Sequence, residues 1–282
     1  MVSSRELDPS ASPPDYYGAE LRRFREDAGL KQAELGSSVF CTGSLVGMIE
    51  KARRVPTRDF SERVDAVLNT GGFFSRLVGL VLRSQLPAWF QAYAEMEARA
   101  GYISTFQAQL IYGLLQTPAY ARAVLGSRSD DDLDAKVAAR MDRQRILERE
   151  GPPLMWVVMS EAALHQEIGG REVMREQLAH LLEQQRREWV QVQILSFEAG
   201  AHAGLPGSFN LLRLDDGHDL VYTEDFVQGH MTANPQAFRE GSLRYDLLQA
   251  AALSVEDSAA RIARVMEERY GHHPAHDGHV VA

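Results

Sequence analysis

LRRFREDAGLKQAELGSSVFCTGSLVGMIEKARRVP, residues 21–56, is the stretch that decides how the N-terminal part of this chain folds. Its first apolar residues recur at helical spacing, and the predicted helix ends at Gly29, because glycine tolerates a left-handed backbone. A second short helix is predicted from Gln32. A third is predicted from Thr42, a residue suited to N-capping, to about Glu50. The spacing therefore predicts a small helical module.

The identities at these spacings resemble the XRE/Cro-type helix-turn-helix family, whose pattern is roughly L-R-x-x-R-x-x-x-G-L-[ST]-Q-x-x-L-A, a turn, and I-E-x-G-x-R-x-P. The matching residues are Leu21, Arg22, Arg25, Gly29, Leu30, Gln32, Leu35, Val46, Ile49, Glu50, Arg54 and Pro56. The resemblance implies a module that binds double-stranded DNA and places the helix beginning at Thr42 in the major groove.

Carried over position by position, the resemblance assigns three kinds of role. Gln32 would contact a phosphate through its amide and the helix N-terminus. Further phosphate contacts would come from Lys31, Lys51, Arg53 and Arg54. The residues on or near the face that meets base edges would be Thr42, Gly43, Ser44, Leu45 and Met48. Arg25 and Glu50 would form an internal ion pair. Ordinary solvated surface is the alternative for the basic residues.

Several departures from the family pattern concern sequence readout. Phe40 replaces the turn glycine, and a bulky side chain tolerates positive φ poorly, so a reshaped turn is expected. Gly36 stands where alanine is usual, and Ala52 where glycine is usual. The recognition face offers Gly43, Gly47, Leu45 and Met48 in place of Arg, Asn or Gln. Few bidentate base contacts are therefore expected, and specificity should be modest.

The charge distribution favours binding by two copies. Residues 20–60 hold eight Lys or Arg and six Asp or Glu, a net charge of +2. The whole chain has a net charge of −9, so the remaining residues together carry −11. A polyanion would attract the N-terminal segment weakly and repel the remainder. The sequence therefore predicts a homodimer on two half-sites, roughly 34 Å apart.

Composition limits the other functional classes. The profile, 45% hydrophobic and 24% charged, is typical of a globular protein, and no apolar run approaches the ~20 residues of a membrane span, so a cytoplasmic protein without a membrane partner is expected. The single cysteine, Cys41, is either a small turn residue or a redox switch. No cofactor and no metal are predicted, although the four histidines of the tail, residues 271–282, could capture a divalent ion. That tail and residues 1–15 are expected to be disordered.

The rest of the chain predicts a mainly α protein with a small sheet. Residues 16–83 are expected to form a five-helix DNA-binding domain with a break at Gly71-Gly72, and Leu86-Pro87 marks its end. A second domain follows over residues 87–270. It is predicted to be helical over 87–150, with helices at about 88–100, 105–115, 118–125 and 131–149. Over 151–270 an α+β arrangement is predicted, with strands in LMWVVM, VQVQILSF, SFNLLRL and DLVYTEDF and a hairpin at Asp216-Gly217.

Residues 87–265 resemble the C-terminal domain of actinobacterial regulators of the WhiJ-like, antitoxin-like kind. The landmarks, in order, are Pro87–Phe90, GLLQTPAYARA from Gly113, Ala138–Leu147, Glu161–Leu164, Met174–Leu178, AGAHAGLPGSFNLL from Ala199, Val221–Glu224 and Ala251–Ser258. The resemblance implies transcriptional control in development or secondary metabolism, with a small protein encoded nearby as partner.

Two groups in this second domain are candidates for binding a partner or ligand. The first is a helical stripe formed by Arg140, Arg143, Gln144 and Leu147, whose alternative is an internal salt-bridge ridge. The second is His202, in a loop that either closes over a pocket or simply connects two elements. G-x-S-x-G, H-E-x-x-H, Walker and G-x-G-x-x-G motifs are absent from the sequence, so catalysis is not expected.

The sequence therefore predicts a sequence-specific DNA-binding transcriptional regulator whose C-terminal domain receives a small protein partner or a ligand. The alternative is an antitoxin-like protein-interaction module with weak or lost base readout.

Overall fold

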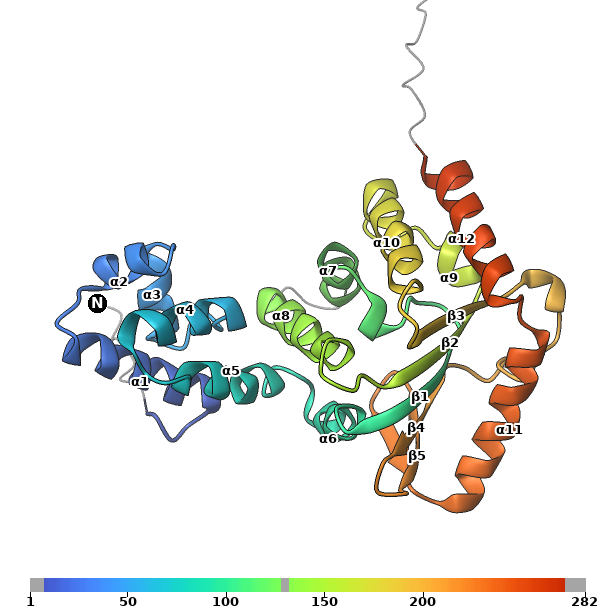
Figure 1. Ribbon diagram of the computed structural model, residues 1–282, viewed down its shortest axis with the longest axis horizontal. Helices are drawn as coiled ribbons and strands as arrows, with labels where there is room; N and C mark the ends of the chain where they lie inside the picture. Colours follow the sequence, from blue (N-terminus) through green and yellow to red (C-terminus); the bar gives the residue numbers. More distant parts are fainter. Residues whose placement is uncertain (1–7, 128–131, 272–282) are drawn as a thin grey trace, which may run out of the picture. The chain divides into compact units, whose positions relative to one another are not determined.

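The computed structural model describes residues 8–127 and 132–271, and the chain divides into two compact units (Figure 1). The first, here called the head unit, contains residues 1–92 and 128–143. The second, the body unit, contains residues 93–127 and 144–282. The two units are described separately.

Five consecutive helices open the head unit, as predicted. They are α1 (Pro13–Asp27), α2 (Gln32–Ser38), α3 (Gly43–Ile49), α4 (Arg58–Leu68) and α5 (Phe73–Arg83). The hydroxyl of Ser12 accepts a hydrogen bond from the backbone N–H of Asp15 and so caps α1. Residues 13–15 are therefore helical, which shortens the disordered start predicted for residues 1–15; residues 1–7 lie outside the described part.

The break between α4 and α5 is held by one carboxylate. Asp65 in α4 accepts backbone N–H groups of Phe74 (2.8 Å) and Ser75 (2.7 Å), and also the hydroxyls of Thr70 and Ser75. The two backbone N–H groups are donors that the first turn of α5 leaves without helical partners. Gly71 and Gly72 supply the left-handed backbone of the turn, at φ 63° and 80°.

The core of the head unit contains a helix that the sequence had assigned elsewhere. The helix α8 (Leu133–Arg143) packs on α5, and its Ala139 joins the cluster built around Tyr17, Leu35 and Val78. Arg58 of α4 forms an ion pair with Asp142 of α8 at 2.7 Å. The predicted boundary at residue 87 is therefore incomplete, because a segment some fifty residues downstream returns to complete the head unit.

The body unit is built on a six-stranded mixed sheet among the described residues, in the order β3-β2-β1-β4-β5-β6. The strands are β1 (Ala100–Gln107), β2 (Leu154–Ser160), β3 (Val190–Leu195), β4 (Phe209–Leu214), β5 (Asp219–Glu224) and β6 (Gly229–Thr232). β1, β2 and β3 run parallel to one another. β4 pairs antiparallel with β1, β5 with β4, and β6 with β5. The predicted hairpin at Asp216-Gly217 links β4 to β5, with Gly217 at φ 82°.

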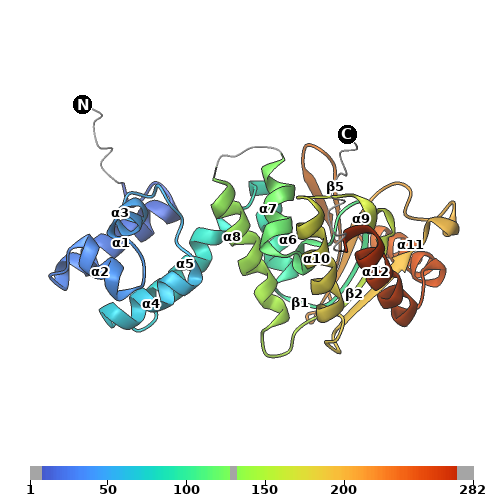
Figure 2. The same ribbon diagram turned by 90° about the horizontal axis from the view of Figure 1, so that it is seen from above.

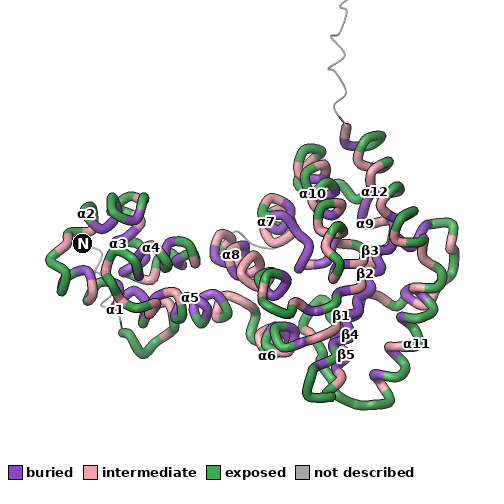
Figure 3. The backbone as a smooth tube through the Cα atoms, viewed as in Figure 1, coloured by how far each residue is buried: buried purple, intermediate pink, exposed green. Residues whose placement is uncertain are grey.

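Helices cover both faces of this sheet. The remaining elements are α6 (Ala88–Glu97), a 3₁₀ turn (Gly113–Leu115), α7 (Pro118–Gly126), a 3₁₀ turn (Gln144–Leu147), α9 (Ala162–His165), α10 (Arg171–Gln184), a 3₁₀ turn (Phe197–Ala199), α11 (Pro235–Ala251) and α12 (Val255–Tyr270). α11 crosses several strands on one side, while α7 and α10 lie together on the other (Figure 2). The strands between them are largely buried (Figure 3).

Two parts of the predicted layout were wrong. Residues 100–107 form the strand β1, whereas helices are predicted over about 88–100 and 105–115, and residues 108–112 are not helical. Four consecutive residues of β1, from Ile103 to Phe106, are buried, so the strand lacks the alternation that separates strands from helices. The four-residue β6 was also missed, because it is short and carries a glycine and a polar exterior.

Candidate nucleic-acid interface

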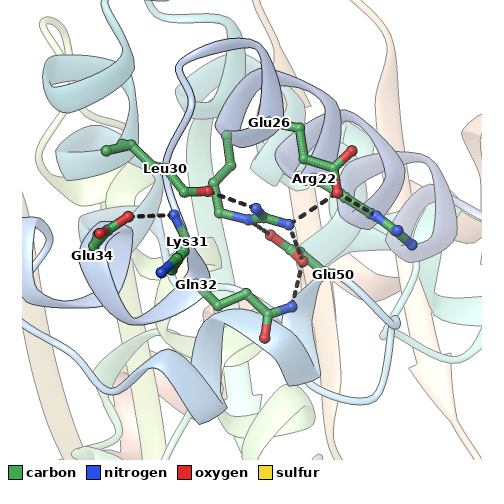
Figure 4. A network of polar contacts seen from close by, with 8 residues as sticks. Arg22, Glu26, Leu30, Lys31, Gln32, Glu34 and Glu50 are labelled. Atoms are coloured by element: carbon green, nitrogen blue, oxygen red, sulfur yellow. Dashed lines mark hydrogen bonds and ion pairs between the residues drawn. The ribbon is translucent and has the colours of Figure 1, made fainter.

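Glu50 organises the polar centre of the head unit (Figure 4). Arg25, its predicted partner, donates from Nε to Oε1 of Glu50 at 2.5 Å and from Nη2 to Oε2 at 3.1 Å. A third guanidinium nitrogen, Nη1, donates to the carbonyl oxygen of Leu30 at 2.7 Å. Arg25 is 7% exposed and Glu50 2% exposed. This two-point ion pair ties α1 to the end of α3, and the carbonyl contact adds the chain before α2.

Gln32 belongs to the same network. Its Nε2 donates to Oε2 of Glu50 at 2.7 Å, and its amide oxygen lies against Gly47. One N–H of the amide that was predicted to contact a phosphate is therefore used to fix the start of α2 to the end of α3. The phosphate contact assigned to this residue would have to come from its second N–H or from the helix N-terminus.

Glycines allow α2 and α3 to approach each other closely. A Cβ at Gly43 would lie 2.7 Å from the Cα of Ala33, and a Cβ at Gly36 would lie 2.8 Å from the backbone nitrogen of Gly43. A Cβ at Gly47 would meet the amide oxygen of Gln32 at 2.8 Å. Gly43 and Gly47 therefore face α2, although the sequence had placed them on the face that meets base edges.

The outward face of α3 is narrow and weakly polar. Thr42, Ser44 and Met48 are exposed, and Leu45 is half-buried. The hydroxyl of Thr42 accepts the backbone N–H of Leu45 at 3.2 Å, so this residue serves as the predicted N-cap. Ser44 and Met48 are left as the side chains best placed to reach a base edge or a thymine methyl group.

Four described residues of the head unit adopt the left-handed conformation without being glycine, and two of them, Phe40 and Ala52, lie in or next to the helix-turn-helix. Phe40, in the turn between α2 and α3, has φ 57° and an 83% exposed side chain, and Ala52 has φ 51°. Phe40 thus holds a positive φ, the conformation that glycine adopts without strain, in spite of its bulky side chain. Each such residue costs about 1–2 kcal/mol. Near the first, Arg63 donates to the carbonyl of Val39 at 3.1 Å.

A cleft of about 710 Å³ gathers the predicted phosphate-contact residues of the head unit. Its lining includes Gln32, Lys51, Arg53 and Arg54. Lys31 is exposed at the start of α2. Acidic residues also line the cleft, and one of them, Asp132, lies just before α8. The cleft therefore collects positive charge and partly neutralises it.

Arg54 has an acidic partner that the sequence did not indicate. Its Nη1 lies 2.5 Å from a carboxylate oxygen of Asp134, and the two side chains are 46% and 38% exposed. Asp134 comes from the first turn of α8, eighty residues downstream. A phosphate that approaches Arg54 would have to compete with this carboxylate.

Comparison with known families assigns both parts of the chain. Residues 17–72 match a helix-turn-helix domain, and residues 90–264, more than half of the chain, match a domain of unknown function, DUF5753. The chain belongs to the DUF5753 family. With its helix-turn-helix domain, this DUF5753 protein is a DNA-binding regulator. No curated protein and no solved structure matches it.

Several residues of the sequence motifs in the DUF5753 domain are buried and make hydrogen bonds or ion pairs inside the body unit. Glu161 is 5% exposed and forms an ion pair with Arg261 at 2.6 Å. Burial alone would raise the pKa of Glu161, but this arginine and the backbone N–H of Phe197 outweigh it and lower the pKa. Gln177 accepts from the backbone N–H of Thr117 and donates to the carbonyl of Leu115, both at 2.7 Å. Such residues fix the body unit internally.

The predicted stripe in the DUF5753 protein is interrupted. α8 ends at Arg143, whose guanidinium lies 4.9 Å from the ring of Phe90, within the head unit. Gln144 starts a 3₁₀ turn in the body unit and donates to the carbonyls of Gly113 and Gln116. Arg140 is half-buried. The four positions therefore do not form one continuous α-helical ridge, because α8 ends after Arg143 and before Gln144.

His202 has a role inside its own loop. Its Nδ1 accepts the backbone N–H of Gly204 at 3.1 Å, and its ring packs edge-on to Phe106. The adjacent Ala203 lines a hollow of about 440 Å³ in the body unit, together with Val221, His230 and Arg244. The loop therefore borders a hollow, which fits the prediction that it closes over a pocket. The imidazole of His202 itself stabilises the conformation of the loop.

The remaining sequence candidates concern redox, metal and membrane roles. Burial raises the pKa of the Cys41 thiol, which disfavours the reactive thiolate that a redox switch needs. Within residues 8–127 and 132–271, no three His, Cys, Asp or Glu side chains are grouped to hold a metal, and no helix could cross a membrane. The histidines at 272, 273, 276 and 279 lie outside the described residues.

Proposed function

We propose that this DUF5753 protein is a transcriptional regulator that binds its operator as a homodimer and acts by binding, without catalysis. In this proposal the body unit receives a small protein partner or a ligand. The observation that carries the DNA-binding part is the cleft that brings Gln32, Lys51, Arg53 and Arg54 together at the ends of α2 and α3. Phosphates would bind there, and Ser44 and Met48 would give a modest sequence preference.

The use of two copies is supported by charge. The segment 20–60 carries a net of only +2 in a chain of net −9, so one head unit would attract DNA weakly. Two linked head units gain affinity because the second binding event becomes intramolecular. The proposed role in development or secondary metabolism, and the small protein encoded nearby, are supported only by the resemblance of residues 87–265 to WhiJ-like regulators.

The test is the double substitution Arg53→Ala with Arg54→Ala. Affinity for genomic DNA fragments at low ionic strength should fall about 10- to 100-fold, and the slope of log affinity against log salt should shrink by about 0.9 for each lost phosphate contact. Electrophoretic mobility shift across a salt series measures both. Arg186→Ala is the matched control, because Arg186 is exposed and lies in the body unit. Unchanged DNA binding in the double variant would contradict the proposed phosphate contacts.

The antitoxin-like module remains the second candidate, and the geometry of α3 favours it in one respect. Two of its seven residues, Gly43 and Gly47, face α2, and its exposed face offers neither Arg, Asn nor Gln. Under that hypothesis the wild-type chain binds a co-purifying small protein without selecting any genomic fragment, and the Arg53→Ala, Arg54→Ala variant retains the same partner affinity.

Asp134 should weaken DNA binding by the wild-type chain. Replacing it by asparagine removes the carboxylate that faces Arg54, so DNA affinity should rise about two- to fivefold, the range expected of an exposed ion pair. The gain should vanish when Asp134→Asn is introduced into an Arg54→Ala background, and a double-mutant cycle on DNA affinity measures this coupling. An equal gain in both backgrounds would show that the effect is general charge reduction.

A further inference from the structure

The two edges of the body sheet are treated differently. At the β3 edge, Ile194 donates its N–H to the hydroxyl of Ser258 at 2.9 Å and accepts the N–H of Leu253 at 2.9 Å. The first turn of α12 and the chain just before it thus cover that edge. The other edge is β6, which pairs with β5 alone and has no strand beyond it in the described part of the chain. Natural proteins usually protect an open edge, because its free N–H and C=O groups can pair with another strand.

The register identifies the backbone groups that β6 presents outward. Asp225 donates its N–H to the carbonyl of Gln228 at 3.0 Å, which closes the β5–β6 hairpin. Hydrogen-bonded and non-hydrogen-bonded pairs alternate in an antiparallel ladder, so the next hydrogen-bonded pair is Thr223 with His230. The backbone groups of Gly229 and Met231 therefore point away from β5, toward the open edge.

The segment that forms this edge exposes several apolar side chains, and Asp225 of the preceding turn is paired with His230 of β6 at 3.1 Å. Phe226 is 90% exposed, Val227 62% and Met231 39%. Residues 226–238 contain no Asp, Glu, Lys or Arg, and residues 230–236 are all exposed. The loop on the other side of the neighbouring hollow, residues 199–208, is likewise uncharged. In a chain of net −9, two copies repel each other on average, and residues 226–238 and 199–208 add no charge to that repulsion.

We propose that β6 pairs antiparallel with β6 of a second copy, so that two body sheets join into one. The proposal rests on the proposed dimeric binding of DNA and names the surface that makes the dimer. An antiparallel strand pair is self-complementary about a two-fold axis, which is the symmetry of most homodimers. With the axis at His230, Gly229 lies opposite the partner's Met231, and the outward backbone groups of both copies meet. The exposed apolar side chains beside the strand become covered.

The principal test uses a proline that blocks the edge and spares the monomer. Met231→Pro removes an N–H that β5 does not use, and proline is tolerated on edge strands, so the body unit should fold normally. Met231→Ala is the matched control, because it shortens the same side chain and keeps the N–H. Sedimentation velocity over a concentration series should show a dimer for the wild type and for Met231→Ala. The dissociation constant should rise at least about tenfold for Met231→Pro.

A second variant tests the pairing directly. At the two-fold axis His230 forms a non-hydrogen-bonded pair with its copy, where Cα atoms lie about 4.5 Å apart, close enough for a disulfide. His230→Cys in a Cys41→Ala background should form a disulfide-linked dimer under mild oxidation. Arg186→Cys in the same background, on an exposed part of the body unit, should remain monomeric on denaturing gels. This result does not depend on how Met231→Pro folds.

The outcomes separate this proposal from the proposed function. A wild-type chain that sediments as a monomer at every concentration, or a dimer that Met231→Pro leaves intact, overturns the β6 interface. The former is also the result expected if a strand of a different protein occupies β6. If the interface is correct, Met231→Pro should retain weak single-head DNA binding, which the added pair Arg53→Ala with Arg54→Ala should weaken further. Loss of DNA binding by Arg53→Ala with an intact β6 dimer shows that the two proposals stand independently.

Discussion

A Glu50→Ala variant is expected to lose about 3–5 kcal/mol of stability in the head unit, because it leaves the guanidinium of Arg25 buried without its partner. Arg25 is 7% exposed, and its pKa is raised chiefly by the hydrogen bonds that it donates to the carboxylate of Glu50. The same substitution removes the acceptor of the Gln32 amide. The substitution would thus remove the carboxylate that joins α1 and α2 to the end of α3.

Hydrogen exchange of peptides covering residues 13–56, measured across a urea series, is the suitable readout, because Trp89, Trp156 and Trp189 all lie outside that segment. Asp27→Ala is the control, since the Asp27 side chain is 66% exposed and its pairing with Arg23 is a surface contact worth at most about 1 kcal/mol. The double variant Arg25→Met with Glu50→Leu should recover most of the loss, because replacing both charges with apolar groups removes the unpaired ion. A single variant as stable as the control would contradict the anchoring role.

Asp65→Ala is expected to cost about 3 kcal/mol, because it deprives the start of α5 of an acceptor for two backbone N–H groups and leaves a buried donor unsatisfied. Burial by itself would raise the pKa of Asp65. The hydroxyls of Ser75 and Thr70 and the N–H groups of Phe74 and Ser75 outweigh that effect and lower the pKa below its usual 3.8. The carboxylate is therefore the form that the folded head unit binds.

The sign of the pH dependence follows from that lowered pKa. A group whose pKa is lower in the folded state contributes stability that is fully present above the unfolded value of 3.8 and is lost as pH falls through the folded value. The thermal stability of the wild type should therefore fall more steeply below about pH 4 than the thermal stability of Asp65→Asn. Glu62→Ala, an exposed residue of α4, should behave as the wild type. Parallel pH profiles for Asp65→Asn and the wild type would refute this assignment.

The helix-turn-helix could be predicted in detail because its determinants are local. The cap at Thr42, the stop at Gly29 and the ion pair of Arg25 with Glu50 each depend on residues within one short segment. The glycines of α3 were misplaced, because helical spacing tells which residues share a face and leaves open which face meets the neighbouring helix. Gly43 and Gly47 turned out to line the contact with α2.

The body unit was predicted less completely. β2, β3, β4 and β5 were found because β-branched and aromatic runs ended in clear turns, and α10, α11 and α12 because their periodicity was long. β1 was mistaken for helix because a central strand buried on both faces has no alternating pattern. The stripe from Arg140 to Leu147 is not one α-helical face, since a helical pattern in sequence does not reveal that the helix ends at Arg143, and its binding role stays a prediction.

By itself, the sequence determined that this chain carries a DNA-binding helix-turn-helix followed by an α+β domain, because caps, turns and apolar periodicity act between residues close in the chain. Only the tertiary structure decided that α8 completes the head unit, that Asp134 faces Arg54, and that β6 is left as the open edge while β3 is covered. These features join residues tens of positions apart. Their energies come from burial and charge pairing that exist only once the chain has folded.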